Sequence, residues 1–352
     1  MAACGIICGA ALLHIPARSS NGHVSSVRPT AEADELPGRE HLIPRAPQDH
    51  SDDENFRTID RPGADFTLLW GIDSQGDIVG TAGKGIAFHG GSGFVRRADG
   101  RFLTIDAAVP GAAVTMTSAR AMNAAGEIVG FYKDTSNFNH GFIRKLDGRF
   151  KVIDYPGAVF RPFEDESGAL AETGALAIDP RGAIVGNCLG VAGDTIKTHG
   201  FMLRHGKYTS IDYPGAVQTF ARGINPAGDI VGRYDILNAS TNQVETHSFL
   251  LHHGKFTSID FPGAVRTFAR GINSAGDIVG RYDILDATTK KPKVLGFLLR
   301  QGDFISIEYP ANGINAPGQI VGSYTSADGK VHGYLMSGAM TGKTGPQRVK
   351  PH

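Results

Sequence analysis

The residues best suited to chemistry are histidines and carboxylates that recur at a fixed spacing. Counting outward from the glycine-containing turn between two strands places each histidine opposite an aspartate. An imidazole beside a carboxylate can transfer protons or ligate a metal ion. The pairs are His140 with Asp154, His199 with Asp212, His247 with Asp260, and His332 with Asp60. Because they recur from repeat to repeat, they cannot converge on one ion. We interpret them as structural cross-strand pairs, each contributing about 0.2–1 kcal/mol, and predict no metal site.

A second set of residues precedes a recurring small-Ile-Asn/Asp triplet. Its members are Trp70, Arg120, Arg222, Arg270 and Asn312, with Leu176 in the remaining repeat. If these side chains face a central channel, the arginines and the tryptophan would suit an anionic or sugar ligand, by bidentate pairing and ring stacking. The alternative is that they pack between neighbouring sheets or pair with Asp229 and Asp277.

Motifs of known catalytic centres are missing from the chain. It contains no Gly-x-Ser-x-Gly, no His-Glu-x-x-His and no Cys-x-x-Cys, so we predict no catalytic residues and no cofactor. The three cysteines, Cys4, Cys8 and Cys188, form no disulfide framework. Cys188 is either a buried filler or a reactive thiol. The acidic insertion 161–167 is a solvated loop or, alternatively, a Ca²⁺ loop without regular ligand spacing.

These residues are positioned by a repeat. Residues 208–237 are nearly identical to residues 256–285, and looser copies surround them. The marker small-Ile-Asn/Asp-x-x-Gly-x-Ile-Val-Gly occurs six times, beginning at Gly71, Ala121, Ala177, Gly223, Gly271 and Gly313. An aromatic-x-x-Ile-Asp/Glu marker and a Gly/Ser-aromatic pair also occur six times each, in constant order. A fixed period of this length indicates a solenoid or a propeller.

Each unit contains about four short runs with strand composition, separated by Gly, Pro and Asn. Four strands per repeat is typical of a propeller blade. The sequence therefore predicts an all-β, six-bladed β-propeller with four-stranded blades. The last unit lacks its outer strand, whereas the chain carries a spare one at residues 56–60. We expect this N-terminal strand to close the last blade.

The ends of the chain differ from the repeats. We predict a leader or degenerate signal segment at 1–17, a disordered lead-in at 18–55, the propeller at 56–337 and a disordered tail at 338–352. The apolar start of the leader is too short to span a membrane. It indicates an extracellular or periplasmic location; a cytoplasmic location is the alternative, because the basic n-region is missing. The 35 basic and 35 acidic residues cancel, so no nucleic-acid partner is expected.

The units GINSAGDIVGRY and HGFMLRHGKYTSIDYPGA resemble the HAF-repeat family of bacterial extracellular repeat proteins. The resemblance covers residues 56–336, with His-Gly-Phe in place of the family's His-Ala-Phe step. It implies a secreted or surface location and no established activity.

Together these observations predict a non-enzymatic, monomeric propeller that binds a small molecule, a glycan or a protein. One alternative is a carbohydrate- or ester-active enzyme with its site at the channel mouth. The other is a purely structural surface module. Paired carboxylates in the channel would favour the enzyme, and a ring of arginines and aromatics would favour binding.

Overall fold

Short strands separated by glycine-centred turns make up the regular structure of the computed structural model. The structure describes residues 55–85, 87, 90–159, 173–192, 195–286, 289–337 and 348–349. Every regular element in these residues is a β-strand, and they contain no helix long and apolar enough to cross a membrane. The described residues belong to one compact unit. The predicted leader, nearly all of the lead-in and the acidic loop 161–167 lie outside them.

Four sheets stand as separate blades, each a meander of antiparallel strands. The first holds β6 (Val114–Met122), β7 (Ile128–Asp134), β8 (Asn139–Arg144) and β9 (Phe150–Ile153). The second holds β10 (Thr173–Ile178), β11 (Ile184–Ala192), β12 (Thr195–Arg204) and β13 (Lys207–Ile211). The third holds β14 (Gln218–Ile224), β15 (Ile230–Asn238), β16 (Gln243–His252) and β17 (Lys255–Ser258). The fourth holds β18 (Arg266–Ile272), β19 (Ile278–Leu285), β20 (Pro292–Arg300) and β21 (Asp303–Ile307), with β25 (Arg348–Val349) added to β21.

The remaining eight strands form one hydrogen-bonded sheet. The prediction of six separate four-stranded blades is therefore wrong, because only four sheets stand as separate blades. This sheet contains β2 (Phe66–Ile72), β3 (Ile78–Gly83), β4 (Ser92–Arg96) and β5 (Phe102–Ile105) from the first repeat. It also contains β22 (Ala311–Ile314), β23 (Ile320–Thr325) and β24 (Val331–Met336) from the last repeat, with β1 (Phe56–Ile59) on β24. The two halves join because Phe66 of β2 pairs in parallel with Val331 of β24. The repeat pattern in the sequence does not predict this single pairing between the first and last repeats.

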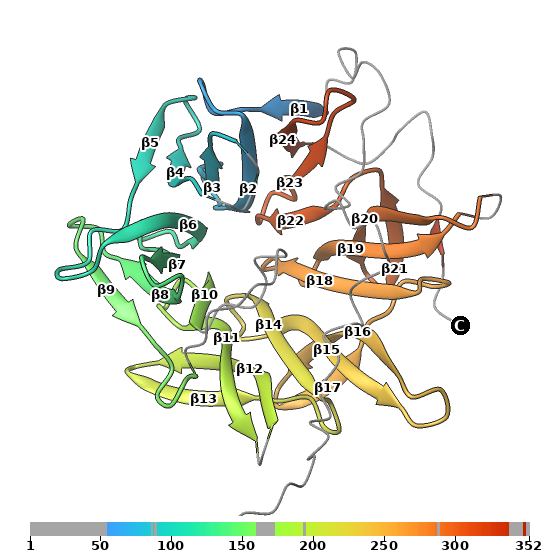
Figure 1. Cartoon of the computed structure of the whole chain (residues 1–352). Helices are drawn as coiled ribbons and strands as arrows, with labels where there is room; N and C mark the ends of the chain where they lie inside the picture. The colour runs from blue at the N-terminus through green and yellow to red at the C-terminus, as the bar shows by residue number, and fades with distance from the viewer. Residues whose placement is uncertain are drawn as a thin grey trace, which may run out of the picture. The chain divides into compact units, whose positions relative to one another are not determined.

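The strands surround a central axis, as in a β-propeller (Figure 1). The strands nearest the axis are β2, β6, β10, β14, β18 and β22, and each contacts the next around the axis. The last of them, β22, contacts β2 and so completes the circle. As the sequence predicts, β1 runs antiparallel to β24, with Phe56 opposite Met336 and Ile59 opposite Gly333.

The repeated Gly and Phe markers face one another across the second and third strands. Gly80 pairs with Phe94 and Gly232 with Phe249. A Cβ added to Gly80 would lie 2.5 Å from Cζ of Phe94, and one added to Gly232 would lie 2.9 Å from Cζ of Phe249. The fully buried ring therefore covers its glycine, and any larger residue would displace the ring.

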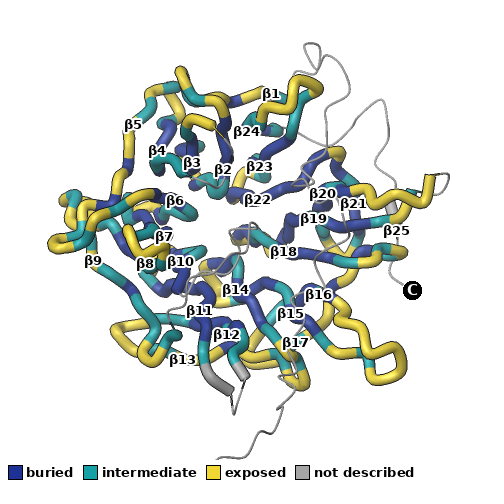
Figure 2. Tube along the Cα trace, in the orientation of Figure 1, coloured by how far each residue is buried: buried dark blue, intermediate teal, exposed yellow. Residues whose placement is uncertain are grey.

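Burial falls from the axis to the rim, where turns and outer strands are exposed (Figure 2). The outer strands β1 and β5 each bury only their last residue, Ile59 and Ile105. Within the predicted tail, Arg348–Val349 pairs with Phe304 and Ile305 of β21. The rest of that tail lies outside the described residues.

Candidate functional site at the inner strands

Every inner strand carries a β-bulge at the same place. The register shifts by one residue between Leu69 and Gly71 of β2, and between Ala221 and Gly223 of β14. The other four inner strands repeat this shift. A bulge leaves one residue out of the ladder and redirects its side chain. The six bulge residues are Trp70, Arg120, Leu176, Arg222, Arg270 and Asn312, the set that precedes the small-Ile-Asn/Asp triplet.

Glycine next to the bulge lets neighbouring inner strands approach closely. A Cβ added to Gly223 would lie 2.8 Å from the carbonyl oxygen of Arg270, and one added to Gly313 would lie 2.9 Å from that of Trp70. Each glycine thus faces the bulge residue of an adjoining strand. The small residue of the sequence marker is needed because the inner strands converge there.

Trp70 and Arg120 form a stacked pair across β2 and β6. The guanidinium carbon of Arg120 lies 3.6 Å from the centroid of the Trp70 ring and 4.8 Å from that of Phe131. Trp70 Nε1 donates a hydrogen bond to Thr81 Oγ1 at 3.1 Å. The buried Nε of Arg120 has no hydrogen-bond partner among the described residues. The pair is held by stacking, and one donor of the arginine remains unused.

Arg270 and Asn312 connect β18 to β22 and β2. Arg270 Nη1 donates to Asn312 Oδ1, and Asn312 Nδ2 donates to the carbonyl oxygen of Leu69 at 2.7 Å. Asn312 is buried. Because its amide accepts from Arg270 while donating to Leu69, Asn312 holds one edge of the Arg270 guanidinium in place.

Arg222 lies beside two arginines that the sequence analysis did not single out. Arg233 of β15 stacks 3.8 Å from the centroid of the Phe220 ring, and Arg281 of β19 stacks 4.1 Å from that of Phe268. Arg222 itself lies 5.7 Å from the Phe220 centroid. The available signal was the residue after Ile-Val-Gly, which is arginine only in the two nearly identical repeats.

Two buried carboxylates accompany these arginines. Arg233 lies 3.4 Å from Asp235, and Asp283 forms an ion pair of 2.8 Å with Arg266. The four arginines at positions 222, 233, 270 and 281 thus share their surroundings with the two carboxylates of the same repeats. Among the residues that the structure describes, the arginines of this cluster outnumber its carboxylates, although the whole chain is neutral.

The arginine pKa values reflect this crowding. Burial and the nearby Arg270 lower the pKa of Arg120 to about 9. Burial, then Arg233, Arg120 and Arg281, lower the pKa of Arg222 to about 9. The pKa of Arg270 lies well below its ordinary value because of burial and then Arg281 and Arg222. Since these guanidiniums keep their protons at pH 7, the shifts measure the free-energy cost of holding several cations together away from water.

The alternative partners of the arginines are occupied elsewhere. The Asp229 carboxylate accepts a hydrogen bond from Asn225 Nδ2 and lies 2.6 Å from His252 Nδ1, while the Asp229 backbone N–H donates to Asn225 Oδ1. Asp277 pairs with Arg300 at 2.9 Å. Neither aspartate has an inner-strand arginine as a partner among the described residues, whereas Arg120 does pack against Trp70 of the neighbouring sheet.

The histidine–aspartate pairs lie on the outer half of the sheets. The Nδ1-to-carboxylate distances are 2.9 Å for His140–Asp154, 2.8 Å for His199–Asp212, 3.0 Å for His247–Asp260 and 2.7 Å for His332–Asp60. Each pair stands in a different repeat, so the pairs remain apart from one another. In the part of the chain that the structure describes, no three His, Cys, Asp or Glu side chains gather as metal ligands would.

Cys188 takes the second-strand position that tyrosine occupies in several other repeats, opposite His199. Its side chain is buried, and burial followed by the charge of Asp212 raises its thiol pKa to about 12. A thiol of such high pKa is protonated at pH 7 and is a poor nucleophile. The geometry favours the buried filler over the reactive thiol.

Comparison with known proteins yields similarity of fold only. No protein-family model and no curated protein matches the chain. Among solved structures, it is similar to a catalytically inactive virginiamycin B lyase from Staphylococcus aureus with quinupristin (12% identity, 80% of this chain and 98% of that chain, TM-score 0.40). It is also similar to the β-propeller domain of the Trilobed protease from Pyrococcus furiosus (11%, 78% and 95%, 0.45). A third is a gluconolactonase from Xanthomonas campestris (13%, 84% and 99%, 0.43). At these TM-scores the likenesses say nothing about the activity of this chain.

Proposed function

We propose that the protein is a non-enzymatic binding propeller whose inner-strand arginines hold an anionic ligand. The observation that carries this proposal is the gathering of Arg222, Arg233 and Arg270 near two carboxylates among the described residues. Like charges held together away from water destabilise the fold. A bound anion offsets this cost, which is why such clusters are typical of sites for charged ligands.

The chemistry of the donors favours a carboxylate or phosphate group. Guanidinium groups present paired N–H donors that match the two oxygens of such groups. The Nε of Arg120 adds a buried donor without a partner among the described residues. One face of the Trp70 ring is already covered by Arg120 at 3.6 Å. This favours recognition of an anion over stacking of a neutral sugar.

The proposal extends to architecture and location. We regard the eight-stranded sheet as two blades that touch through the Phe66–Val331 pairing, which gives a six-bladed ring with one bulge residue from each blade. The six sets of repeat markers support this interpretation. The resemblance to the HAF-repeat family supports a protein exported from a bacterium, acting outside the cytoplasm.

Calorimetric titration tests the proposed ligand class. Inorganic phosphate and citrate are titrated into the protein at low ionic strength in an uncharged buffer. We expect saturable binding that Arg222→Met weakens about ten- to a hundredfold, the usual effect of losing a charge-assisted hydrogen bond. Arg204→Met is the matched control, because Arg204 is exposed at the end of β12. Absence of binding by both anions, or equal weakening by both variants, refutes the proposal.

A further inference from the structure

The histidine–aspartate pattern is broken in the first repeat. There the third strand begins with Ser92 where four other repeats have histidine, while the carboxylate is kept as Asp106. The register is the same, since Gly93 pairs with Ile105 as Gly200 pairs with Ile211. Neither the Ser92 nor the Asp106 side chain has a hydrogen-bond or ion-pair partner among the described residues. The first repeat therefore keeps the strand register and the carboxylate but lacks the imidazole.

The same repeat lacks two further rings. Ala82 lies opposite Ser92, whereas Tyr132 and Tyr234 hold the equivalent position opposite histidines, their ring centroids 5.1 and 5.4 Å from the imidazoles. Ala107 follows Asp106, where the corresponding residues in four other repeats are Tyr155, Tyr213, Phe261 and Tyr309. Two of these rings, Tyr213 and Phe261, stack 3.6 and 3.7 Å from tyrosines of the next repeat.

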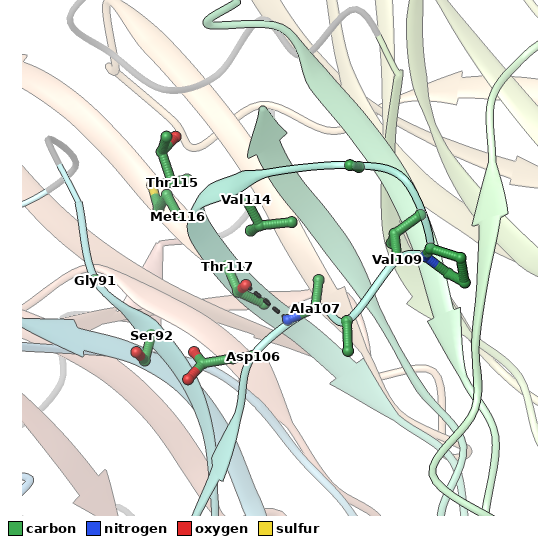
Figure 3. A pocket seen from close by; sticks show the side chains of 12 residues that line it. Gly91, Ser92, Asp106, Ala107, Val109, Val114, Thr115, Met116 and Thr117 are labelled. Atoms are coloured by element: carbon green, nitrogen blue, oxygen red, sulfur yellow. Dashed lines mark hydrogen bonds between the residues drawn. The ribbon is translucent and has the colours of Figure 1, made fainter. Parts of the chain in front are cut away.

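A cavity of about 660 Å³ opens where these side chains are missing. It is lined by Ser92, Asp106 and Ala107, and by Val109, Val114 and Thr117 from the connection to β6 and from β6 itself. Figure 3 shows the Asp106 carboxylate beside Ser92, with the two valines on the far side. Thr117 Oγ1 accepts a hydrogen bond from the backbone N–H of Ala107 at 3.0 Å, which fixes the wall. The volume is that of a small-molecule site.

We propose that this cavity binds a small ligand that carries an imidazole ring. The carboxylate is the hydrogen-bond acceptor that four of the other repeats use for their own imidazole, at 2.7–3.0 Å. The alanines and valines supply apolar surface for the faces of a planar ring. In four repeats the carboxylate is hydrogen-bonded to a histidine of the chain itself. In the first repeat the same carboxylate accepts a hydrogen bond from the imidazole of a ligand. This site is separate from the inner-strand arginines and does not depend on their function.

Ligand-observed NMR titration with imidazole and with histamine tests the proposal. We expect saturable binding with a dissociation constant near the millimolar range, given the small size of the probes. Thiazole, a ring of similar size without an N–H group, serves as the control ligand and should not bind. Asp106→Asn should weaken imidazole binding about ten- to a hundredfold. The exposed position of Asp106 allows this variant to fold.

A matched pair of variants at position 92 separates occupancy from folding. Ser92→Ala keeps the cavity and should retain binding, whereas Ser92→His supplies an internal imidazole and should abolish it. Binding that survives Ser92→His, that is unchanged in Asp106→Asn, or that thiazole shares overturns the proposal. So does a failure of both imidazole and histamine to saturate. If Ser92→His does not melt cooperatively, the comparison of Asp106→Asn with wild type decides. None of these results bears on anion binding, which Arg222→Met tests independently.

Discussion

Replacing Arg222 by methionine should make the protein more stable while removing function. In most proteins, truncating a half-buried side chain costs free energy of unfolding. Here the side chain is a cation whose named electrostatic neighbours, Arg233, Arg120 and Arg281, are all cations. Methionine keeps most of the length and apolar surface of the arginine stem. The substitution therefore removes repulsion and desolvation but little packing.

The magnitude follows from the pKa of Arg222, which falls from its ordinary value to about 9. One pKa unit corresponds to 1.36 kcal/mol, so the cost of the charge has an upper limit of about 5 kcal/mol. The residue as a whole is only partly buried, and an effective dielectric constant of about 20 reduces such energies several-fold. The weak contact with Phe220, at 5.7 Å, offsets little. We expect a gain of about 1–2 kcal/mol.

Urea unfolding in low salt, followed by fluorescence, measures this gain. The expected result is a higher midpoint at unchanged m-value for Arg222→Met, and a change within about 0.5 kcal/mol for the exposed Arg204→Met. Added phosphate or citrate should stabilise the wild type by mass action and leave Arg222→Met almost unaffected. A loss of stability in Arg222→Met, together with an undiminished response to the anions, would refute the reasoning.

Three further predictions concern the rest of the fold. Phe56→Ala should lower the free energy of unfolding by about 2–4 kcal/mol, because this ring of β1 stacks on Tyr334 at 5.2 Å; equal urea midpoints for variant and wild type would show that β1 does not close the ring. His199→Ala should cost about 1 kcal/mol by removing the 2.8 Å bond to Asp212, with calorimetric anion binding intact; lost binding at unchanged stability would contradict a structural role. In a Cys4→Ser, Cys8→Ser variant, Cys188 should react with a chromogenic disulfide only as fast as the protein unfolds, since its thiol pKa is raised to about 12; rapid labelling of this folded variant would argue against burial.

The sequence predicted the strands well because their signals are local and repeated. Each turn relies on a residue such as Gly228, at φ +91°, and on an asparagine such as Asn225, which accepts a bond from the Asp229 N–H at 2.9 Å. Such turn chemistry can be recognised in a short window. Counting outward from the turns also placed the histidines beside their aspartates, since antiparallel register follows from turn length.

What the sequence could not predict depends on contacts between repeats. The pairing of Phe66 with Val331, which merges two repeats into one sheet, joins residues far apart in the chain. The bulges could not be predicted from the sequence either. In a short strand, one extra residue makes it ambiguous which side chains alternate to which face of the sheet. The sequence analysis did not select Arg233 and Arg281, because they lie in the two nearly identical repeats. There, a residue shared by both copies is readily interpreted as structural.

Both candidate sites occur at positions whose residue varies among the repeats. In a repeat protein each unit is stabilised by the interface with the next, so a residue common to all units is constrained by that interface. The small residue of the marker shows this at Gly223, where a Cβ would lie 2.8 Å from the carbonyl oxygen of Arg270 in the next repeat. A position that varies, such as the residue after Ile-Val-Gly, is free of that constraint. Arginine there in two adjacent repeats concentrates charge, whereas serine and alanine in the first repeat open a cavity beside a retained carboxylate. Substitutions at such positions should therefore alter binding more than stability, and the reverse should hold at the shared ones.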